Sequence, residues 1–297
     1  MFENVLVGVD FRQGGRDAIA LAGQLSDEAT STTLAHVCAG RFTRSHAIGP
    51  GLVAEECERA RDQLEEERTG AGVRAELVVT QRPTQGQGLH ELAEERGADL
   101  LVLGSCHRGA FGRAMLGDHT RASIDGAPCA VAIAPAGYAE SPRPLATIGV
   151  AYDGSPESQA ALEAARELAG AHHSKIRALQ IVTLAYYPYA APGSLVAQIS
   201  ESVKEANAAM KALEGVDGHA EYGLPGSDLA VFSETVDLLV CGSRGYGPWG
   251  RLVHGSTSSQ LAHHTRSPLL IVPRPGAPGG SAEQAAGEHA AISAPVE

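Results

Sequence analysis

A glycine-rich segment at residues 242–258 carries the residues best suited to chemistry, and that chemistry is the binding of an anion. The segment reads GSRGYGPWGRLVHGSTS. Glycines let backbone N–H groups approach an anion, because no Cβ stands in the way. Gly255 and Ser256 open a predicted helix, whose free N–H groups and dipole favour negative charge, and Ser256 and Ser258 add hydroxyl donors. The segment therefore predicts a phosphate site that needs no lysine.

Simpler interpretations of the same segment remain open. A glycine after a strand often makes only a tight turn, and Thr257 with Gln260 resembles the capping box of a helix start. Gly245, Gly247 and Gly250 imitate a dinucleotide-binding fingerprint, but that motif follows the first strand of its domain and this one follows the fourth. A Walker A loop needs Gly-Lys-Ser/Thr, which does not occur in the chain.

The segment belongs to a unit that occurs twice in the chain. Residues 5–10 (VLVGVD) resemble 148–153 (IGVAYD), and residues 98–105 (ADLLVLGS) resemble 235–243 (TVDLLVCGS). The offsets agree: 143 positions from Asp10 to Asp153, 138 from Gly104 to Gly242, and 140 from Pro128 to Pro268. Such a repeat predicts a first domain at 1–136, a linker at 137–144, a second domain at 145–274 and a disordered tail at 275–297.

Short apolar strands alternate with helical patterns in both copies. The predicted strands are 4–9, 32–38, 73–79, 99–103 and 129–134, then 147–152, 176–182, 217–222, 237–241 and 268–272. The predicted helices are 14–25, 52–68, 86–96 and 118–126, then 156–169, 194–213, 226–234 and 255–264. This alternation predicts an α/β fold with two doubly wound, parallel five-stranded sheets in tandem. Ligands of such sheets bind beyond the carboxyl ends of the strands, where the strand order switches.

The charge and the cysteines argue against several classes of protein. The chain has 23 Lys and Arg residues against 35 Asp and Glu, which gives a formal charge of −12. A negative protein is repelled by the phosphate backbone, so this charge argues against a protein whose main task is to bind nucleic acid. No leader pattern and no apolar run near the ~18 residues of a membrane span is evident, so we expect a cytoplasmic protein without membrane contact. The five cysteines are scattered without CxxC spacing, which favours reduced thiols over a disulfide framework or a zinc site.

The spacing Gly242-x2-Gly245-x9-Gly255-Ser256 is similar to the nucleotide-binding signature of the universal stress protein family. Residues 153–155 (DGS) and 267–273 (SPLLIVP) resemble the same family. The resemblance extends over both copies, at 1–136 and 145–274. It implies a fold like that of the adenine nucleotide alpha hydrolases, with the fifth strands at 129–134 and 268–272 paired antiparallel. The two domains would then form a pseudo-dimer within one chain, which could dimerise again as a homodimer.

The same resemblance implies a site for an adenine nucleotide, ATP carried with Mg²⁺. Asp153 would hold the ribose or adenine side, and Ala151 and Ile181 would flank the adenine. The residue types agree, because a carboxylate accepts hydrogen bonds from ribose hydroxyls and apolar strand ends suit a purine. The residues implied to line the phosphates are Gly242, Arg244, Gly245, Gly255, Ser256, Thr257 and Ser258.

The first copy departs from this signature. At the matching spacing His107 replaces the second glycine, and Asp118 replaces the serine that opens the helix. An aspartate there satisfies the helix dipole itself and repels a phosphate. Phe11 also follows Asp10 where Gly154 follows Asp153. We therefore expect a degenerate site in the first copy and one competent nucleotide site per chain, in the second.

Three functions agree with this pattern. The first is a cytosolic, ATP-binding stress-response protein that acts as a nucleotide-dependent regulator, with at most weak ATP hydrolysis. The second is a slow ATPase or nucleotidyl-transfer enzyme, although the segment offers only His254 as a nearby general base. The third is a nucleotide-free interaction module in which both sites have decayed.

Overall fold

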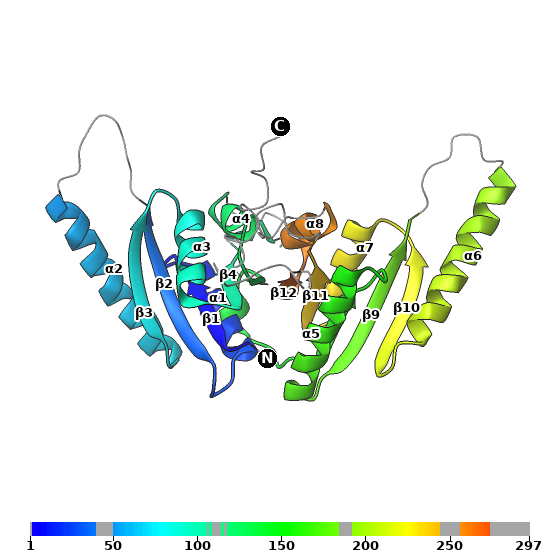
Figure 1. Ribbon diagram of the computed structural model, residues 1–297, viewed down its shortest axis with the longest axis horizontal. Helices are drawn as coiled ribbons and strands as arrows, with labels where there is room; N and C mark the ends of the chain where they lie inside the picture. The colour runs from blue at the N-terminus through cyan, green and yellow to red at the C-terminus, as the bar shows by residue number, and fades with distance from the viewer. Residues whose placement is uncertain are drawn as a thin grey trace, which may run out of the picture.

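The computed structural model describes residues 2–39, 50–105, 107–108, 114–115, 118–183, 192–243 and 256–273. Strands and helices alternate through both halves, as predicted (Figure 1). The first half contains β1 (Asn4–Gly8), α1 (Gln13–Leu25), β2 (Ser31–Ala39), α2 (Pro50–Ala71), β3 (Glu76–Arg82), α3 (Gln85–Arg96), β4 (Leu100–Gly104), β5 (His107–Arg108), β6 (Ala114–Met115), α4 (Asp118–Ile124) and β7 (Ala130–Ala134). The hairpin of β5 and β6 is not predicted, because strands of two residues leave no readable pattern.

The second half repeats the order without that hairpin in its described residues. A short helix η1 (Tyr138–Glu140) leads into it. It contains β8 (Thr147–Ala151), α5 (Pro156–His172), β9 (Lys175–Val182), α6 (Pro192–Lys211), β10 (Val216–Tyr222), α7 (Pro225–Phe232), η2 (Ser233–Thr235), β11 (Leu238–Gly242), α8 (Ser256–His264) and β12 (Leu269–Val272). The tail predicted at 275–297 lies outside the described residues.

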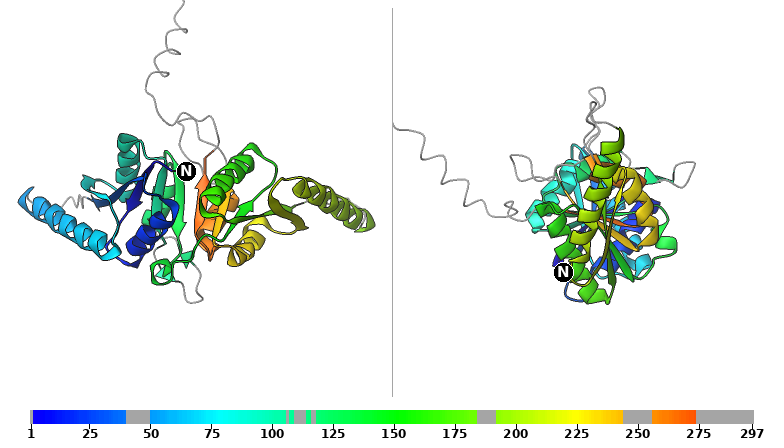
Figure 2. Two further views of the ribbon diagram at one scale, coloured as in Figure 1. Left: turned by 90° about the horizontal axis from the view of Figure 1, so that it is seen from below. Right: turned by 90° about the vertical axis from the view of Figure 1, so that its right-hand side faces the viewer.

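The two predicted five-stranded sheets are joined into one sheet of ten strands. Its order is β10-β9-β8-β11-β12-β7-β4-β1-β2-β3, and every pair within a half is parallel. The expected antiparallel pairing of the fifth strands is present, with Leu270 opposite Ala132 at the middle of the β7–β12 ladder. Figure 2 shows β12, in orange, beside a green strand at the centre. Neither of these two strands is therefore an open edge.

The six central strands, from β8 to β1 in the sheet order, are buried on both faces, which explains why their sequences are continuous apolar runs. In β1, Val5 and Val7 belong to one buried cluster, and Leu6 between them belongs to the other. Such alternation within an apolar run is the sign of a parallel sheet that carries helices on both sides. In Figure 1, α2 and α6 lie at the outer ends, and α4 and α8 lie near the centre.

Strand β3 begins three residues later than predicted. The expectation of 73–79 rested on the apolar residues Val73 and Ala75, but both lie in the connection between α2, which ends at Ala71, and β3. Gly72 there has a φ of +64°, and the Val73 N–H donates to the carbonyl oxygen of Arg68 at 3.2 Å. Val73 and Ala75 pack against the core from this connection, so their apolar character reflects burial rather than a strand.

The segment at 137–144, predicted as a linker, is partly docked on α1. The Asp17 carboxylate is fully buried and accepts hydrogen bonds from the backbone N–H groups of Gly137 and Ala139, both at 2.8 Å. Gln13 donates a third hydrogen bond to it at 3.0 Å. Buried charges are stable when their oxygens are satisfied in this way, so Asp17 anchors η1, and with it the junction, to the first half.

None of the helices in the described stretches combines the length and the apolar character needed to cross a membrane. Their burial pattern is instead that of helices covering a sheet, with one face in the core and the other polar.

Candidate functional site

A cavity of about 530 Å³ opens in the second half, beyond the carboxyl ends of β8 and β11. These strands are neighbours in the sheet, and the chain leaves them toward opposite sides, so the cavity lies at the switch in strand order. Its volume falls in the range of pockets that hold small ligands. The lining residues are Ala151, Tyr152, Asp153, Ser155, Glu157, Ser158, Leu179, Ile181, Thr183, Pro225, Leu229, Cys241, Gly242, Ser243, Thr257 and Ser258.

The cavity brings together most of the residues singled out from the sequence. The predicted residues that line it are Ala151, Asp153, Ile181, Gly242, Thr257 and Ser258. Ser256 is the first residue of α8, but its side chain is not among those described. Arg244, Gly245 and Gly255, like the alternative base His254, lie outside the described residues. The predicted residues whose side chains the structure describes therefore line one cavity.

Asp153 stands just after the end of β8 with an exposed carboxylate at the cavity. Its Oδ1 accepts a hydrogen bond from the backbone N–H of Ser155 at 3.0 Å. Partial burial raises the pKa of Asp153, but hydrogen bonds from Ser155 and Ser158 outweigh that effect and leave the pKa below its usual value. Asp153 is therefore ionised at neutral pH and acts as a hydrogen-bond acceptor.

Ser155 makes this arrangement possible because it is also the N-cap of α5. Its hydroxyl accepts a hydrogen bond from the backbone N–H of Ser158 at 3.2 Å. Gly154, between Asp153 and Ser155, has a φ of +80°, a conformation that favours glycine. The sequence Asp-Gly-Ser thus ends the strand, turns the chain and caps the helix while it holds the carboxylate at the cavity.

Gly242 has a packing role that the sequence pattern does not express. A Cβ at this position would lie 2.5 Å from the carbonyl oxygen of Glu157, in the first turn of α5. The missing side chain therefore lets β11 approach α5 closely, in addition to any room it leaves for a ligand. The equivalent Gly104 faces Gly14 in the same way in the first half.

Several lining residues were missed by reasoning from motifs. The most informative is Ser243, which is 1% exposed and whose Oγ has no hydrogen-bond partner among the described residues. A buried hydroxyl without a partner in a cavity wall is a group that a bound ligand can satisfy. Its position directly after a strand of a doubly wound sheet is the signal that could have found it.

The remaining missed residues are divided between polar and apolar side chains. Leu179 and Leu229 face the cavity from β9 and α7, and Cys241 contributes from β11. Burial raises the pKa of the Cys241 thiol to about 12, so it is neutral at physiological pH. A cavity with apolar walls, a carboxylate and hydroxyl groups can accept a flat ring system together with polar substituents. Within the described stretches no three His, Cys, Asp or Glu side chains converge on a metal site.

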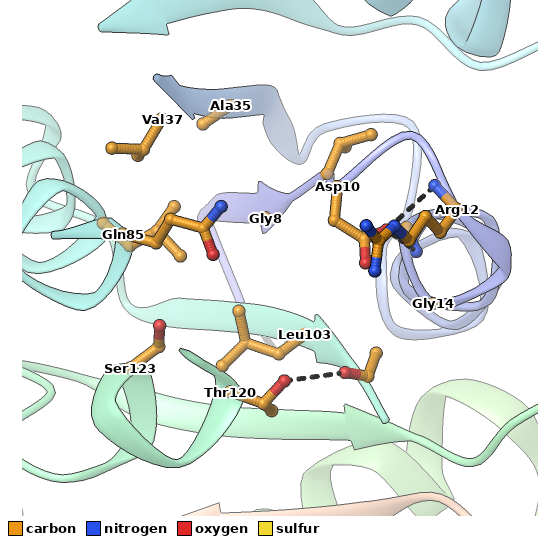
Figure 3. Close-up of a pocket in the computed structure, with 14 residues that line it drawn as sticks. Gly8, Asp10, Arg12, Gly14, Ala35, Val37, Gln85, Leu103, Thr120 and Ser123 are labelled. Carbon is orange, nitrogen blue, oxygen red and sulfur yellow. Dashed lines mark hydrogen bonds between the residues drawn. The ribbon is translucent and has the colours of Figure 1, made fainter. Parts of the chain in front are cut away.

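The first half contains a smaller cavity of about 230 Å³ in the equivalent place (Figure 3). The register of the sheet makes Gly8 equivalent to Ala151, because Gly8 pairs with Ala35 as Ala151 pairs with Leu179. Asp10 lines this cavity, and its Oδ1 accepts hydrogen bonds from the backbone of Arg12 and Gly15.

The smaller volume has a local cause at the floor of the cavity. Leu103 stands where the second half has Cys241, and a Cβ on Gly8 would lie 2.9 Å from its Cδ2. Leucine is larger than cysteine, so its side chain leaves less room at this point of the cavity. Figure 3 shows Leu103 projecting toward Gly8. The Thr120 hydroxyl donates a hydrogen bond to the carbonyl oxygen of Gly104 at 3.2 Å.

The other departures in the first half are seen only in part. Phe11 has a φ of +57°, which is strained for a residue with a side chain, and its ring stacks on His36 at 4.2 Å between centroids. Phe11 thus adopts the backbone conformation that Gly154 supplies without strain. His107 belongs to β5 and Asp118 begins α4, but the side chains of both are outside the description.

Comparison with known proteins agrees with the tandem architecture. A model of the universal stress protein family matches residues 1–135 and 145–273. A universal stress protein of Mycobacterium tuberculosis is 28% identical over 243 residues, covering 75% of this chain and 76% of the relative. One from Thermus aquaticus is 32% identical over 139 residues, covering 42% of this chain and 97% of the relative.

Solved structures give the same result for the fold. The crystal structure of a universal stress protein from Archaeoglobus fulgidus matches with a TM-score of 0.64 and 18% identity. The match covers 91% of this chain and 98% of that chain, so both halves are included. Because the family model accounts for each half separately, this chain belongs to the universal stress protein family and carries two of its domains in tandem.

Proposed function

We propose that the chain is an ATP-binding universal stress protein with one competent nucleotide site, formed by its second half. The observation that carries the proposal is the convergence of Asp153 and Ile181 with Ser258 on a cavity of about 530 Å³. Asp153 follows β8, Ile181 lies on β9 and Ser258 lies on α8, and the sequence separates them by many positions. They meet at the place where doubly wound sheets hold their ligands.

The cavity supplies a suitable group for each part of ATP. Ala151 and Ile181, with Leu179 beside them, offer an apolar slot for the adenine. The Asp153 carboxylate can accept hydrogen bonds from the ribose hydroxyls. Thr257 and Ser258, in the first turn of α8, can hold the phosphates together with the helix N–H groups. Mg²⁺ would arrive on the phosphates, because segment 242–258 has no lysine to neutralise them.

The first half has a different role in this proposal. Its cavity is less than half as large, and Asp118 opens the helix at the position of Ser256. Extra negative charge and less room both disfavour a nucleotide there. The chain would thus act as a cytoplasmic regulator in which one half responds to ATP and the other completes the ten-stranded sheet.

Nucleotide released from the purified protein tests this assignment. Wild-type protein is denatured and any released nucleotide is identified by chromatography, and the Gly245→Glu variant is treated in the same way. We expect ATP from the wild type and none from the variant, since a carboxylate would stand in the phosphate loop. His107→Glu places the same side chain at the matching position of the first half and should leave the ATP content unchanged. Retention of ATP by Gly245→Glu would contradict the proposed site.

A further inference from the structure

Two cysteines of the first half, distant in sequence, lie in contact. Cys38 is near the end of β2 and Cys57 is on α2, and their Sγ atoms are 3.7 Å apart. Both are free thiols. Nineteen positions separate them, with no motif to signal the pair, so only the packing of α2 against β2 brings them together.

The two thiols differ in their access to solvent. Cys38 is 8% exposed, whereas Cys57 is partly exposed on the outer helix. Burial, and then the hydrogen bond with Cys57, raises the pKa of Cys38 to about 12. Cys38 therefore stays protonated and unreactive by itself, and a dissolved oxidant reaches Cys57 first.

We propose that Cys38 and Cys57 are an oxidation site, at which a peroxide converts the two thiols into a reversible intramolecular disulfide. The Cys57 thiolate attacks one oxygen of hydrogen peroxide, the O–O bond breaks, and a sulfenic acid and hydroxide form. The hydroxide takes up the proton that Cys57 released and becomes water. The Cys38 sulfur then attacks the Cys57 sulfur, the S–O bond breaks, and the departing hydroxide leaves as water with the proton of Cys38. Two thiols are oxidised and one peroxide is reduced to two waters.

The geometry requires only a local adjustment. A disulfide has an S–S distance of about 2.05 Å, so the sulfurs must approach by about 1.6 Å. Rotation about the side-chain bonds with a small shift of α2 can supply this. The other described cysteines, Cys129 and Cys241, are buried, and burial raises the pKa of each thiol to about 12. They are therefore expected to resist the same oxidant.

The pair belongs to the first half and lies on the opposite face of β2 from the first-half cavity. Val182 holds the position of Cys38 in the second half, because Ala35 on β2 pairs with Gly8 as Leu179 on β9 pairs with Ala151. On β2, Val37 lines the first-half cavity, while Cys38 points to the other face of the sheet. The disulfide would link α2 covalently to β2, which contributes Val37 to this cavity. Oxidation would therefore modify the first half and leave the second half unchanged.

Peroxide treatment of the full chain at low protein concentration tests the proposal. We expect the thiols titrated after denaturation to fall from five to three, with a loss of two hydrogens in the intact mass and recovery by dithiothreitol. Trypsin should then yield a linked pair of peptides, because Arg41 and Arg44 lie between the two cysteines in the sequence. The far-UV circular dichroism should not change.

Two single variants and one control make the result decisive. Cys57→Ser and Cys38→Val, the latter copying Val182, should each abolish the loss of two hydrogens, and Cys241→Ser should leave it intact. Either single variant is sufficient if the other fails to fold. A linked peptide pair with other cysteines, disulfide-linked dimers in place of the internal bond, or five remaining thiols in wild-type protein would overturn the proposal.

Discussion

The Ser256→Asp variant is expected to bind ATP at least ~100-fold more weakly than the wild type. The substitution gives the second half the acid with which Asp118 opens α4 in the first half. Two unit charges about 4 Å apart repel by about 4 kcal/mol at the effective dielectric of a partly buried site. A loss of about 2.7 kcal/mol already corresponds to a factor of about 100 in the dissociation constant. Titration calorimetry of nucleotide-free protein measures this change.

Ser256→Asn is the matched control for charge. Asparagine has nearly the size of aspartate and caps a helix equally well, but it is neutral. We expect it to weaken ATP binding by less than about tenfold, and both variants should unfold at similar denaturant concentrations. Equal losses in the Asp and Asn variants would show that shape, not charge, decides binding at the start of α8.

The Gly104→Ala variant should lose at least about 3 kcal/mol of the free energy of unfolding. The added Cβ would overlap the carbonyl oxygen of Gly14, which belongs to the backbone of α1 and cannot rotate away. Relief requires α1 to move off β4, against which it packs. Overpacking against backbone belongs to the severe class of core substitutions. Urea denaturation followed by circular dichroism gives the change.

Gly23→Ala serves as its control. Gly23 also lies in the first half, on the exposed side of α1, and a Cβ there would meet nothing within 4 Å. Alanine favours a helix over glycine by up to about 1 kcal/mol, so this variant should be as stable as the wild type or slightly more so. A Gly104→Ala protein as stable as Gly23→Ala would contradict the close approach of β4 and α1.

Much of the fold could be predicted from the sequence because it is expressed locally. Continuous apolar strands alternating with helical patterns indicate a parallel sheet covered by helices on both faces. The same pattern occurs in both copies of the repeat, which strengthens the prediction. The pattern is misleading where an apolar residue packs on the core from a connection. Val73 follows α2 and packs on the core without belonging to β3. The joining of ten strands into one sheet depends on contacts between the halves, and only family resemblance indicated the β7–β12 pairing.

The candidate site was predictable only as a place and a set of residue types. Asp153 and the start of α8 follow from strand ends and glycine spacing. The size of each cavity depends on side chains that meet across neighbouring strands, such as Gly8 on β1 and Leu103 on β4. Likewise, the contact of Cys38 with Cys57, and the fact that the Ser243 hydroxyl finds no partner among the described residues, depend on packing in three dimensions rather than on a sequence pattern.

Titration of the nucleotide-free chain with ATP in the presence of Mg²⁺ tests the central claim most directly. The proposal predicts one binding event per chain, which disappears in Gly245→Glu and persists in His107→Glu. Two equal sites per chain, or an unchanged titration in Gly245→Glu, would contradict the assignment of a single nucleotide site to the second half.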